Sequence, residues 1–141
     1  MREPERALTV VGEWIEKAEN DLKTAVHTLK LGTKCPTDTV CFHAQQVVEK
    51  YLKALLTWRG IDFHKTHDIE ALVALVPRAI RPHLSASEQG TLTDYATVAR
   101  YPGDYGPITL AQARTAVRIA RRVRGEIRKL LPKAALRRAA R

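Results

Sequence analysis

The chain has 141 residues, a length expected for one domain. Hydrophobic residues make up 45% of it and charged residues 28%, which is typical of a globular protein and excludes a disordered one. No apolar run is long enough for a membrane span, and the first ten residues are too charged for a secretion signal. Two cysteines, Cys35 and Cys41, do not make a disulfide framework. These features predict a cytoplasmic protein that does not contact a membrane.

The net charge of +9 is unevenly distributed along the chain. Eleven basic residues and one acid, Glu126, lie between Arg114 and Arg141, whereas the rest of the chain carries 13 basic and 14 acidic groups. A segment of this kind can receive a phosphate-rich or acidic partner. The alternative is a solvated helix face followed by a loose tail.

Apolar residues recur at steps of three and four in two long segments. The first predicts a helix over 8–31, with Gly32 at its end and Pro36 preventing its continuation. Thr37 or Asp38 can cap a second helix, over about 38–59, which Gly60 ends.

Three shorter or later helices follow. One starts near Asp68 and ends before Pro77 and Pro82. The next has Ser85 as a candidate N-cap, with Glu88 at the capping-box spacing, and ends at Arg100. Thr109 can cap the last helix, which ends at Pro132.

No strand-like alternation is present, so we expect an all-α protein. The pattern predicts an antiparallel, up-and-down bundle of five helices with a four-helix-bundle core. We expect residues 1–132 to form this single domain and residues 133–141 to be a basic, frayed tail, although Ala135 and Leu136 would allow a helix there.

The most unusual stretch is CFHAQQVVEKYLKALL, from Cys41 to Leu56. One helix face carries four polar residues at steps of three and four: His43, Gln46, Lys50 and Lys53. Polar groups beside an apolar seam favour contact with another subunit or a ligand. The alternative is a solvent-exposed face with ordinary Glu–Lys pairs.

The run FHAQQVVEKYLKALL, followed by THDIEALV and later by ARYP, resembles the HEPN domain family, and AENDLKTA resembles the first helix of that family. The likeness extends from about Trp14 to Val123. It implies a five-helix up-and-down bundle, usually a homodimer, with a role linked to nucleotides or RNA. Many members are paired with a minimal nucleotidyltransferase as a toxin–antitoxin system. Some are metal-independent ribonucleases that place an Arg-x4-6-His motif from each subunit at the dimer cleft.

The sequence departs from the family at that motif. Four residues separate Arg100 from Tyr105, which stands at the place where the spacing would put histidine. A histidine can move the proton of a 2′-hydroxyl at neutral pH, whereas a tyrosine, with an ordinary pKa of about 10, is a poor base there. Arg100 can still hold a phosphate through its planar guanidinium. Because the nucleotidyltransferase of a pair can modify a tyrosine near this motif, Tyr105 is also a candidate acceptor, the alternative being a plain structural tyrosine.

The loop before the third helix carries His64, His67 and Asp68. These side chains would need a further good ligand to hold zinc, and Cys41 and His43 are candidates only if the fold brings them close. We favour the interpretation that Asp68 caps the helix and His67 packs or hydrogen-bonds at the loop, and we expect neither a metal nor a cofactor. The resemblance places a histidine at His67 beside the second helix, which makes it a better cleft residue than His64.

The sequence therefore favours a non-catalytic module that forms a homodimer and binds a nucleotide, RNA or a nucleotidyltransferase partner. Lys50 and Arg100 would hold phosphate, Gln46 would contact a base or ribose, and His67 would orient the bound group. The expected nucleotide- or phosphate-binding residues are His43, Gln46, Lys50, His67 and Arg100. The alternative is a metal-independent ribonuclease toxin in which Arg100 acts with His67, His43 or ionised Tyr105 as base. A third interpretation is RNA binding through Arg114–Arg141.

Overall fold

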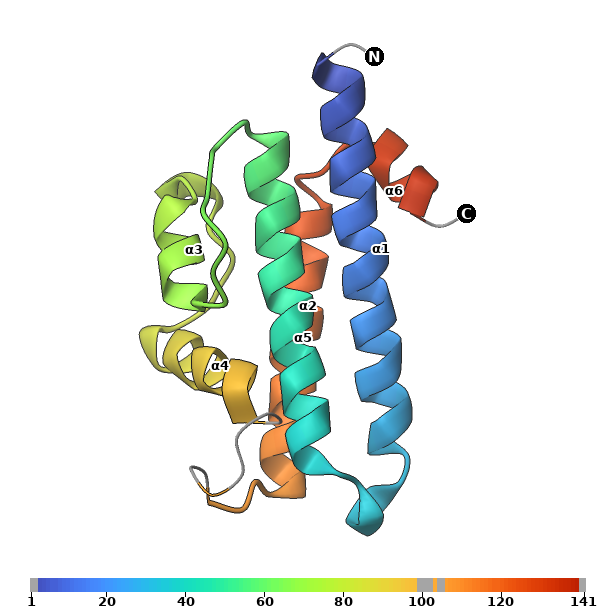
Figure 1. Cartoon of the computed structure of the whole chain (residues 1–141), viewed down its shortest axis with the longest axis vertical. Helices are drawn as coiled ribbons and strands as arrows, with labels where there is room; N and C mark the ends of the chain where they lie inside the picture. Colours follow the sequence, from blue (N-terminus) through green and yellow to red (C-terminus); the bar gives the residue numbers. More distant parts are fainter. Residues whose placement is uncertain (1–2, 99–102, 104–105, 140–141) are drawn as a thin grey trace.

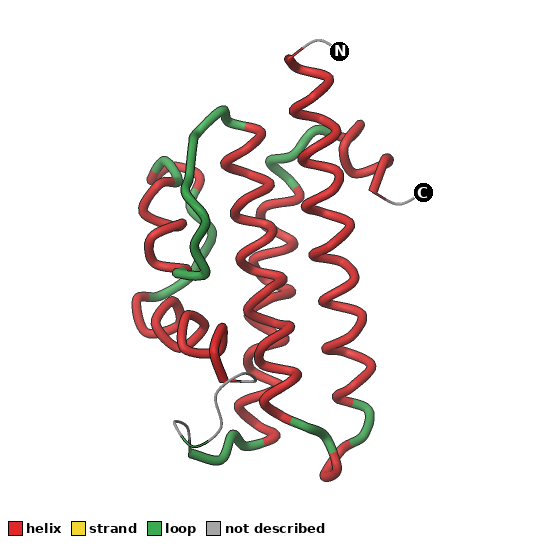
Figure 2. The backbone as a smooth tube through the Cα atoms, in the orientation of Figure 1, coloured by secondary structure: helices red, strands yellow, loops and turns green. Residues whose placement is uncertain are grey.

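Three long helices run side by side and form the body of the molecule (Figure 1). They are α1 (Glu3–Leu29), α2 (Thr37–Trp58) and α5 (Leu110–Arg128). The computed structural model describes residues 3–98, 103 and 106–139. Arg100 and Tyr105 lie outside the described residues. Within the described part every regular element is a helix and no strand is present (Figure 2), so the all-α prediction is confirmed.

The turn between α1 and α2 is set by glycine and proline. Gly32 has a φ of +60°, a left-handed conformation that lets the chain leave α1, and a 3-10 turn, η1 (Gly32–Lys34), follows. Pro36 then stands directly before α2. At the other end of α2, Gly60 has a φ of +70°, and the Ile61 amide donates to the Leu56 carbonyl, which is the Schellman arrangement. The predicted end of the first helix and both predicted ends of the second helix lie within two residues of the observed ones.

The return path from the top of α2 to the start of α5 uses two short helices instead of one long one (Figure 1). These are α3 (Ile69–Leu75) and α4 (Ala86–Val98), with a 3-10 turn, η2 (Arg78–Ile80), between them. Asp68 caps α3 by accepting from the Ala71 amide, and Ser85 and Glu88 form the predicted reciprocal capping box. Both short helices pack against α2 and complete the fourth side, while α1 runs antiparallel to α2 and α5.

A sixth helix, α6 (Lys133–Ala139), is present where we expected a frayed tail. It packs against α1, and the Ala135 side chain is fully buried. Gly12 of α1 lies at this contact, where a Cβ would come within 3.6 Å of Arg138 Cδ and 3.7 Å of the Ala135 carbonyl oxygen, which are ordinary contact distances. The alanine-rich segment also has a high helix propensity. The described residues thus hold six α-helices, one more than the five predicted.

The core lies between α1, α2 and α5, with α3, α4 and α6 covering its sides. Its largest fully buried aliphatic side chains include Ile15, Leu52, Leu55 and Ile127. Each contributes about 1.5–3 kcal/mol through the apolar surface removed from water. Thr109 caps α5 in a capping box with Gln112, as the sequence predicts. No helix of the described residues combines the length and apolar character needed to cross a membrane.

Candidate functional site

A row of polar side chains on α2 is buried inside the protein. Its members are Gln45, Gln46, Glu49 and Lys53, whose exposed fractions run from 0% to 8%. Gln46 and Lys53, two members of the polar face predicted from the sequence, lie in this buried row. It is covered by the loop that joins α2 to α3, and its groups bond to one another.

Glu49 stands at the centre of this row. Its Oε1 accepts from Gln45 Nε2 at 3.0 Å and lies 2.8 Å from His67 Nδ1, while its Oε2 accepts from Lys53 Nζ at 3.0 Å. Burial by itself would raise the pKa of Glu49, but hydrogen bonds from Gln45, His67 and Lys53 and the charge of Lys53 outweigh it, so the pKa is lowered. The carboxylate is therefore ionised at neutral pH and fully engaged.

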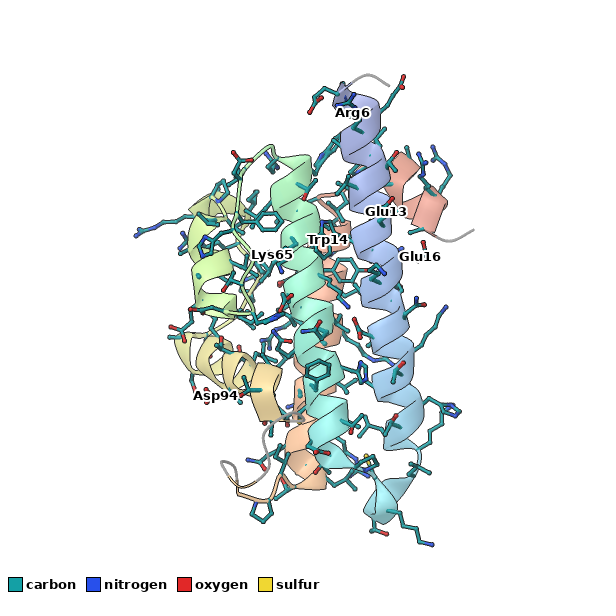
Figure 3. All side chains as sticks on the ribbon, in the orientation of Figure 1. Arg6, Glu13, Trp14, Glu16, Lys65 and Asp94 are labelled. Carbon is teal, nitrogen blue, oxygen red and sulfur yellow. The ribbon has the colours of Figure 1, made fainter. Side chains whose placement is uncertain are left out.

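The ammonium of Lys53 is sealed by aromatic rings. Its Nζ lies 5.4 Å from the ring centre of Trp14 on α1 and 5.9 Å from that of Phe63 in the covering loop. Trp14 projects into the space between α1 and α2 (Figure 3). Cation–π contacts of this kind stabilise a desolvated ammonium that already has a carboxylate partner. Lys53, Trp14 and Phe63 thus join α1, α2 and the loop.

A second carboxylate, Asp21 of α1, contacts two basic side chains of α2. Its Oδ1 lies 2.8 Å from His43 Nδ1 and its Oδ2 accepts from Lys50 Nζ at 2.5 Å. The side chain of Asp21 is 11% exposed, whereas those of His43 and Lys50 are 25% and 18% exposed. The side chains of His43 and Lys50 are therefore partly exposed to solvent, and Asp21 holds them in position from the buried side.

The predicted site residues separate into three groups. Gln46 is buried and donates to Gln45 Oε1 at 2.6 Å, so it is closed off from a ligand in this structure. His43, Lys50 and His67 remain accessible, and His67 is the most open, with 53% of its side chain exposed. Arg100 and Tyr105, the residues of the altered motif, lie outside the described residues.

The described residues on both sides of the undescribed segment contact the first turns of α2. Tyr95 of α4 forms a side-chain hydrogen bond with Cys41, and Thr37 Oγ1 donates to the Ile108 carbonyl at 2.7 Å. His43 follows Cys41 by two residues. The chain therefore leaves α4 and enters α5 near the end of α2 that carries His43.

A third polar cluster joins α1, α2 and α5. Glu19 accepts two hydrogen bonds from Arg124 Nε and one from Arg124 Nη2, at 2.7–3.1 Å, and one from the Tyr51 hydroxyl at 2.9 Å. Arg128 donates to the same hydroxyl at 3.1 Å. Burial would raise the pKa of Glu19, but the Arg124 and Tyr51 hydrogen bonds and both arginine charges outweigh it and lower that pKa. Burial also raises the pKa of Tyr51 to about 12. This cluster is structural.

The loop histidines do not make a metal site with the residues that the structure describes. No group of three or more His, Cys, Asp or Glu side chains there has the arrangement to hold a metal ion. His64 is exposed and away from the Glu49 cluster, whereas His67 is bonded to it. The preference for His67 as the residue beside α2 therefore agrees with the geometry.

The sequence analysis missed Asp21 as a partner of His43 and Lys50. A signal was present, because Asp21 falls three residues after Ala18 and four before Ala25, both on the apolar stripe of α1 and both fully buried. A carboxylate on such a stripe needs an internal partner. The partner itself could only be identified from the packing of α1 on α2.

Comparison with known proteins agrees with this architecture. Residues 11–130 match the HEPN domain. The crystal structure of TT1696 from Thermus thermophilus is similar, with a TM-score of 0.70, 26% sequence identity, and coverage of 86% of this chain and 98% of that chain. No curated protein matches the sequence.

Proposed function

Because the chain belongs to the HEPN domain family, we propose that it is a binding module without ribonuclease activity of its own, which takes a nucleotide or an RNA phosphate along the exposed edge of α2. Three side chains form this α2 edge: His43, Lys50 and His67. Arg100 would add a guanidinium from the segment after α4.

One observation carries the proposal. Each member of the α2 edge is held from inside by a carboxylate and keeps part of its side chain exposed. Fixed nitrogen donors are suited to an anionic ligand, since little side-chain entropy is lost when the ligand binds. The carboxylates of Asp21 and Glu49 also keep these side chains in place while no ligand is bound.

The same geometry argues against an efficient base on α2. Glu49 is buried, ionised and engaged on both oxygens, so it does not reach a substrate hydroxyl. A general base must come within hydrogen-bond reach of the proton that it takes. His43 Nδ1 already lies against Asp21, which also accepts from Lys50.

The ribonuclease alternative rests on the Glu49–His67 contact. A carboxylate on Nδ1 fixes the imidazole and leaves its other nitrogen available, which is an arrangement found in catalytic bases. Here Lys53 already neutralises that carboxylate, which weakens its support for an imidazolium. We therefore propose binding as the function and keep RNA cleavage as the alternative.

The proposal includes a homodimer and a partner. Family members act beside a minimal nucleotidyltransferase, and we propose the same toxin–antitoxin-like pairing here, with the α2 edge and Tyr105 near the contact. Light scattering of the pure protein tests the dimer. Co-expression with the nucleotidyltransferase of a neighbouring reading frame, followed by affinity purification, tests the pair.

Calorimetric titration with AMP, ATP and a short RNA tests ligand binding. We expect binding in wild type and at least a tenfold loss in the variant Lys50→Gln/His67→Gln, from two lost charge-assisted hydrogen bonds. The matched control Lys17→Gln/His64→Gln removes one exposed lysine and one exposed histidine elsewhere and should bind like wild type. An equal loss in both variants would remove the α2 edge as the site.

Incubation with tRNA in EDTA tests catalysis. Wild type and Arg100→Ala should leave the RNA equally intact. If wild type cleaves the RNA and Arg100→Ala does not, our proposal is wrong and the ribonuclease alternative is favoured.

A further inference from the structure

The structure divides the basic residues of the C-terminal segment into engaged and free groups. Arg124 and Arg128 are bound to the Glu19–Tyr51 cluster, and Arg122 donates to Glu88 at 2.7 Å. α6 carries the later basic residues to the upper half of α1. Only part of the positive charge is therefore available on the outer face of α5.

The available arginines share one face of α5. Arg114, Arg118 and Arg121 follow at steps of four and three and are exposed. Arg118 donates to the Thr115 hydroxyl at 3.4 Å, and among the described residues none of the three has a carboxylate partner. They form one row of cations along the helix.

α1 supplies a second row next to the first. A groove between α1 and α5 is lined by Leu22, Lys23, Val26, His27, Lys30 and Arg121. Lys23, His27 and Lys30 are exposed on its α1 side, while Leu22 and Val26 are half-buried at its floor. The sequence analysis assigned no role to these α1 residues.

The two rows run along each other in register. Glu19 faces Arg124, and α1 is antiparallel to α5, so residues that follow Glu19 on α1 lie beside residues that precede Arg124 on α5. Lys23 to Lys30 and Arg121 to Arg114 each span seven residues, or about 10 Å. Both rows descend toward the turn between α1 and α2.

The surface between these rows holds no opposing charge among the residues that the structure describes. Asp21 faces α2, where it is used by His43 and Lys50, and the next acidic residue along the chain is Asp38. In α5 the only acid is Glu126, which accepts from the His83 amide at 2.8 Å on another side. Above the two rows Glu19 is bonded to Arg124, and Glu13 and Glu16 lie higher still on α1 (Figure 3), so these acidic residues set the upper limit of the rows.

We propose that this basic strip, made of Lys23, His27, Lys30, Arg114, Arg118 and Arg121, binds the phosphate backbone of RNA without regard to sequence. Two neighbouring rows of basic side chains beside a groove suit a linear polyanion, and arginine pairs with phosphate through two parallel hydrogen bonds. An acidic protein partner would favour a central apolar anchor. Of the described large apolar side chains that are exposed, Leu31 is the one adjoining the strip in sequence, and it lies beyond the end of α1.

The strip is separate from the α2 edge. Asp21 and Leu22 are consecutive, yet Asp21 contacts α2 and Leu22 lines the groove with α5. The strip would hold an extended backbone, and the α2 edge would hold a single phosphate or nucleotide. Variants at the two places therefore distinguish failure of this inference from failure of the proposed function.

The test is fluorescence anisotropy of a labelled oligouridine RNA at salt concentrations from about 50 to 200 mM. Each phosphate contact with a single strand contributes about 0.7 to the slope of log affinity against log salt. Lys23→Gln/Arg118→Gln/Arg121→Gln should lower that slope by about 2, so over this range wild type should lose about 20-fold more affinity than the variant. Calorimetric titration of this triple variant with AMP should give the wild-type affinity, because AMP is too small to span the strip, so the two proposals can fail separately.

The matched control is Arg59→Gln/Arg78→Gln/Lys133→Gln, which removes three exposed charges from three other places. It should retain the wild-type slope, and melting curves should show that both triple variants are folded. Three results would each overturn the inference: no RNA binding by wild type at low salt, a flat salt dependence, or an equal loss of slope in the control. Competition by polyglutamate as strong as by RNA would also overturn it, in favour of an acidic protein.

Discussion

Replacing Glu49 with glutamine should strongly destabilise the fold. The change keeps the shape of the side chain but leaves the Lys53 ammonium buried between Trp14 and Phe63 without its counter-charge. At 3.0 Å and an effective dielectric constant of about 20, the lost attraction is about 5 kcal/mol. Water reaching Lys53 offsets part of it, so we expect a loss of about 3–5 kcal/mol, a large share of the 5–15 kcal/mol typical of a domain.

Urea denaturation of four proteins tests this value: wild type, Glu49→Gln, Lys53→Met and the double variant. The double variant removes both charges and should be at least about 2 kcal/mol more stable than Glu49→Gln alone. Glu16→Gln, at an exposed position, is the control and should change stability by less than about 0.5 kcal/mol. A loss below about 1 kcal/mol in Glu49→Gln, or no coupling in the cycle, would refute the reasoning.

The decrease in the free energy of unfolding at acid pH gives an independent check on the role of Glu49. Because the folded chain lowers the pKa of Glu49 below its ordinary value of 4.5, ionised Glu49 stabilises the fold above that value, and this stability is lost as pH falls through the lowered pKa. Glu19 and Glu88, whose pKa values are also lowered, contribute to the same limb. Glu49→Gln should therefore show a shallower decline below about pH 4.5 than wild type, and an unchanged decline would contradict the assignment.

Three further changes have defined outcomes. Asp21→Asn should lower stability by about 1–3 kcal/mol and weaken nucleotide affinity in calorimetry, since His43 and Lys50 lose the carboxylate that fixes them; an unchanged affinity would count against the α2 edge. Ala135→Glu places a charge at a fully buried position and should release α6 from α1, so trypsin should cut within α6; wild-type resistance would contradict the docking. Burial raises the pKa of Cys41 to about 11, so its thiol stays protonated below that pH, and a thiol reagent near neutral pH should modify the half-exposed Cys35 first; equal rates would exclude this difference.

The helices and three of their caps could be predicted from the sequence because their signals are local, whereas the predicted cap of α2 by Thr37 or Asp38 was wrong, since Pro36 stands at the N-cap and no side chain caps that helix. Asp68, Ser85 and Thr109 cap the helices that they precede, as an oxygen-bearing side chain at those positions indicates. α6 was missed because it packs against α1, where it buries Ala135, and the two helices are more than a hundred positions apart in the sequence. A seven-residue helix is too short to be predicted from its own propensity.

The sequence placed the candidate residues on α2 but did not predict which of them are exposed. Helical spacing placed His43, Gln46 and Lys50 on one face of α2, and they do lie along it. Spacing says nothing of which side chains a loop will cover, so Gln46 was expected to meet a ligand and is instead buried. The loop covers it because Phe63 and His67 find partners on α2, which is a tertiary effect.

The aromatic seal over Lys53 makes Trp14 an optical probe. The half-buried indole shares the ammonium with Phe63, so raising the loop would admit water to the ring and move its emission to longer wavelength. With Trp58→Phe as the background, fluorescence would report loop position from Trp14 alone, since the chain has two tryptophans. Because the same loop carries His67, the emission of one indole can follow events at the α2 edge in real time.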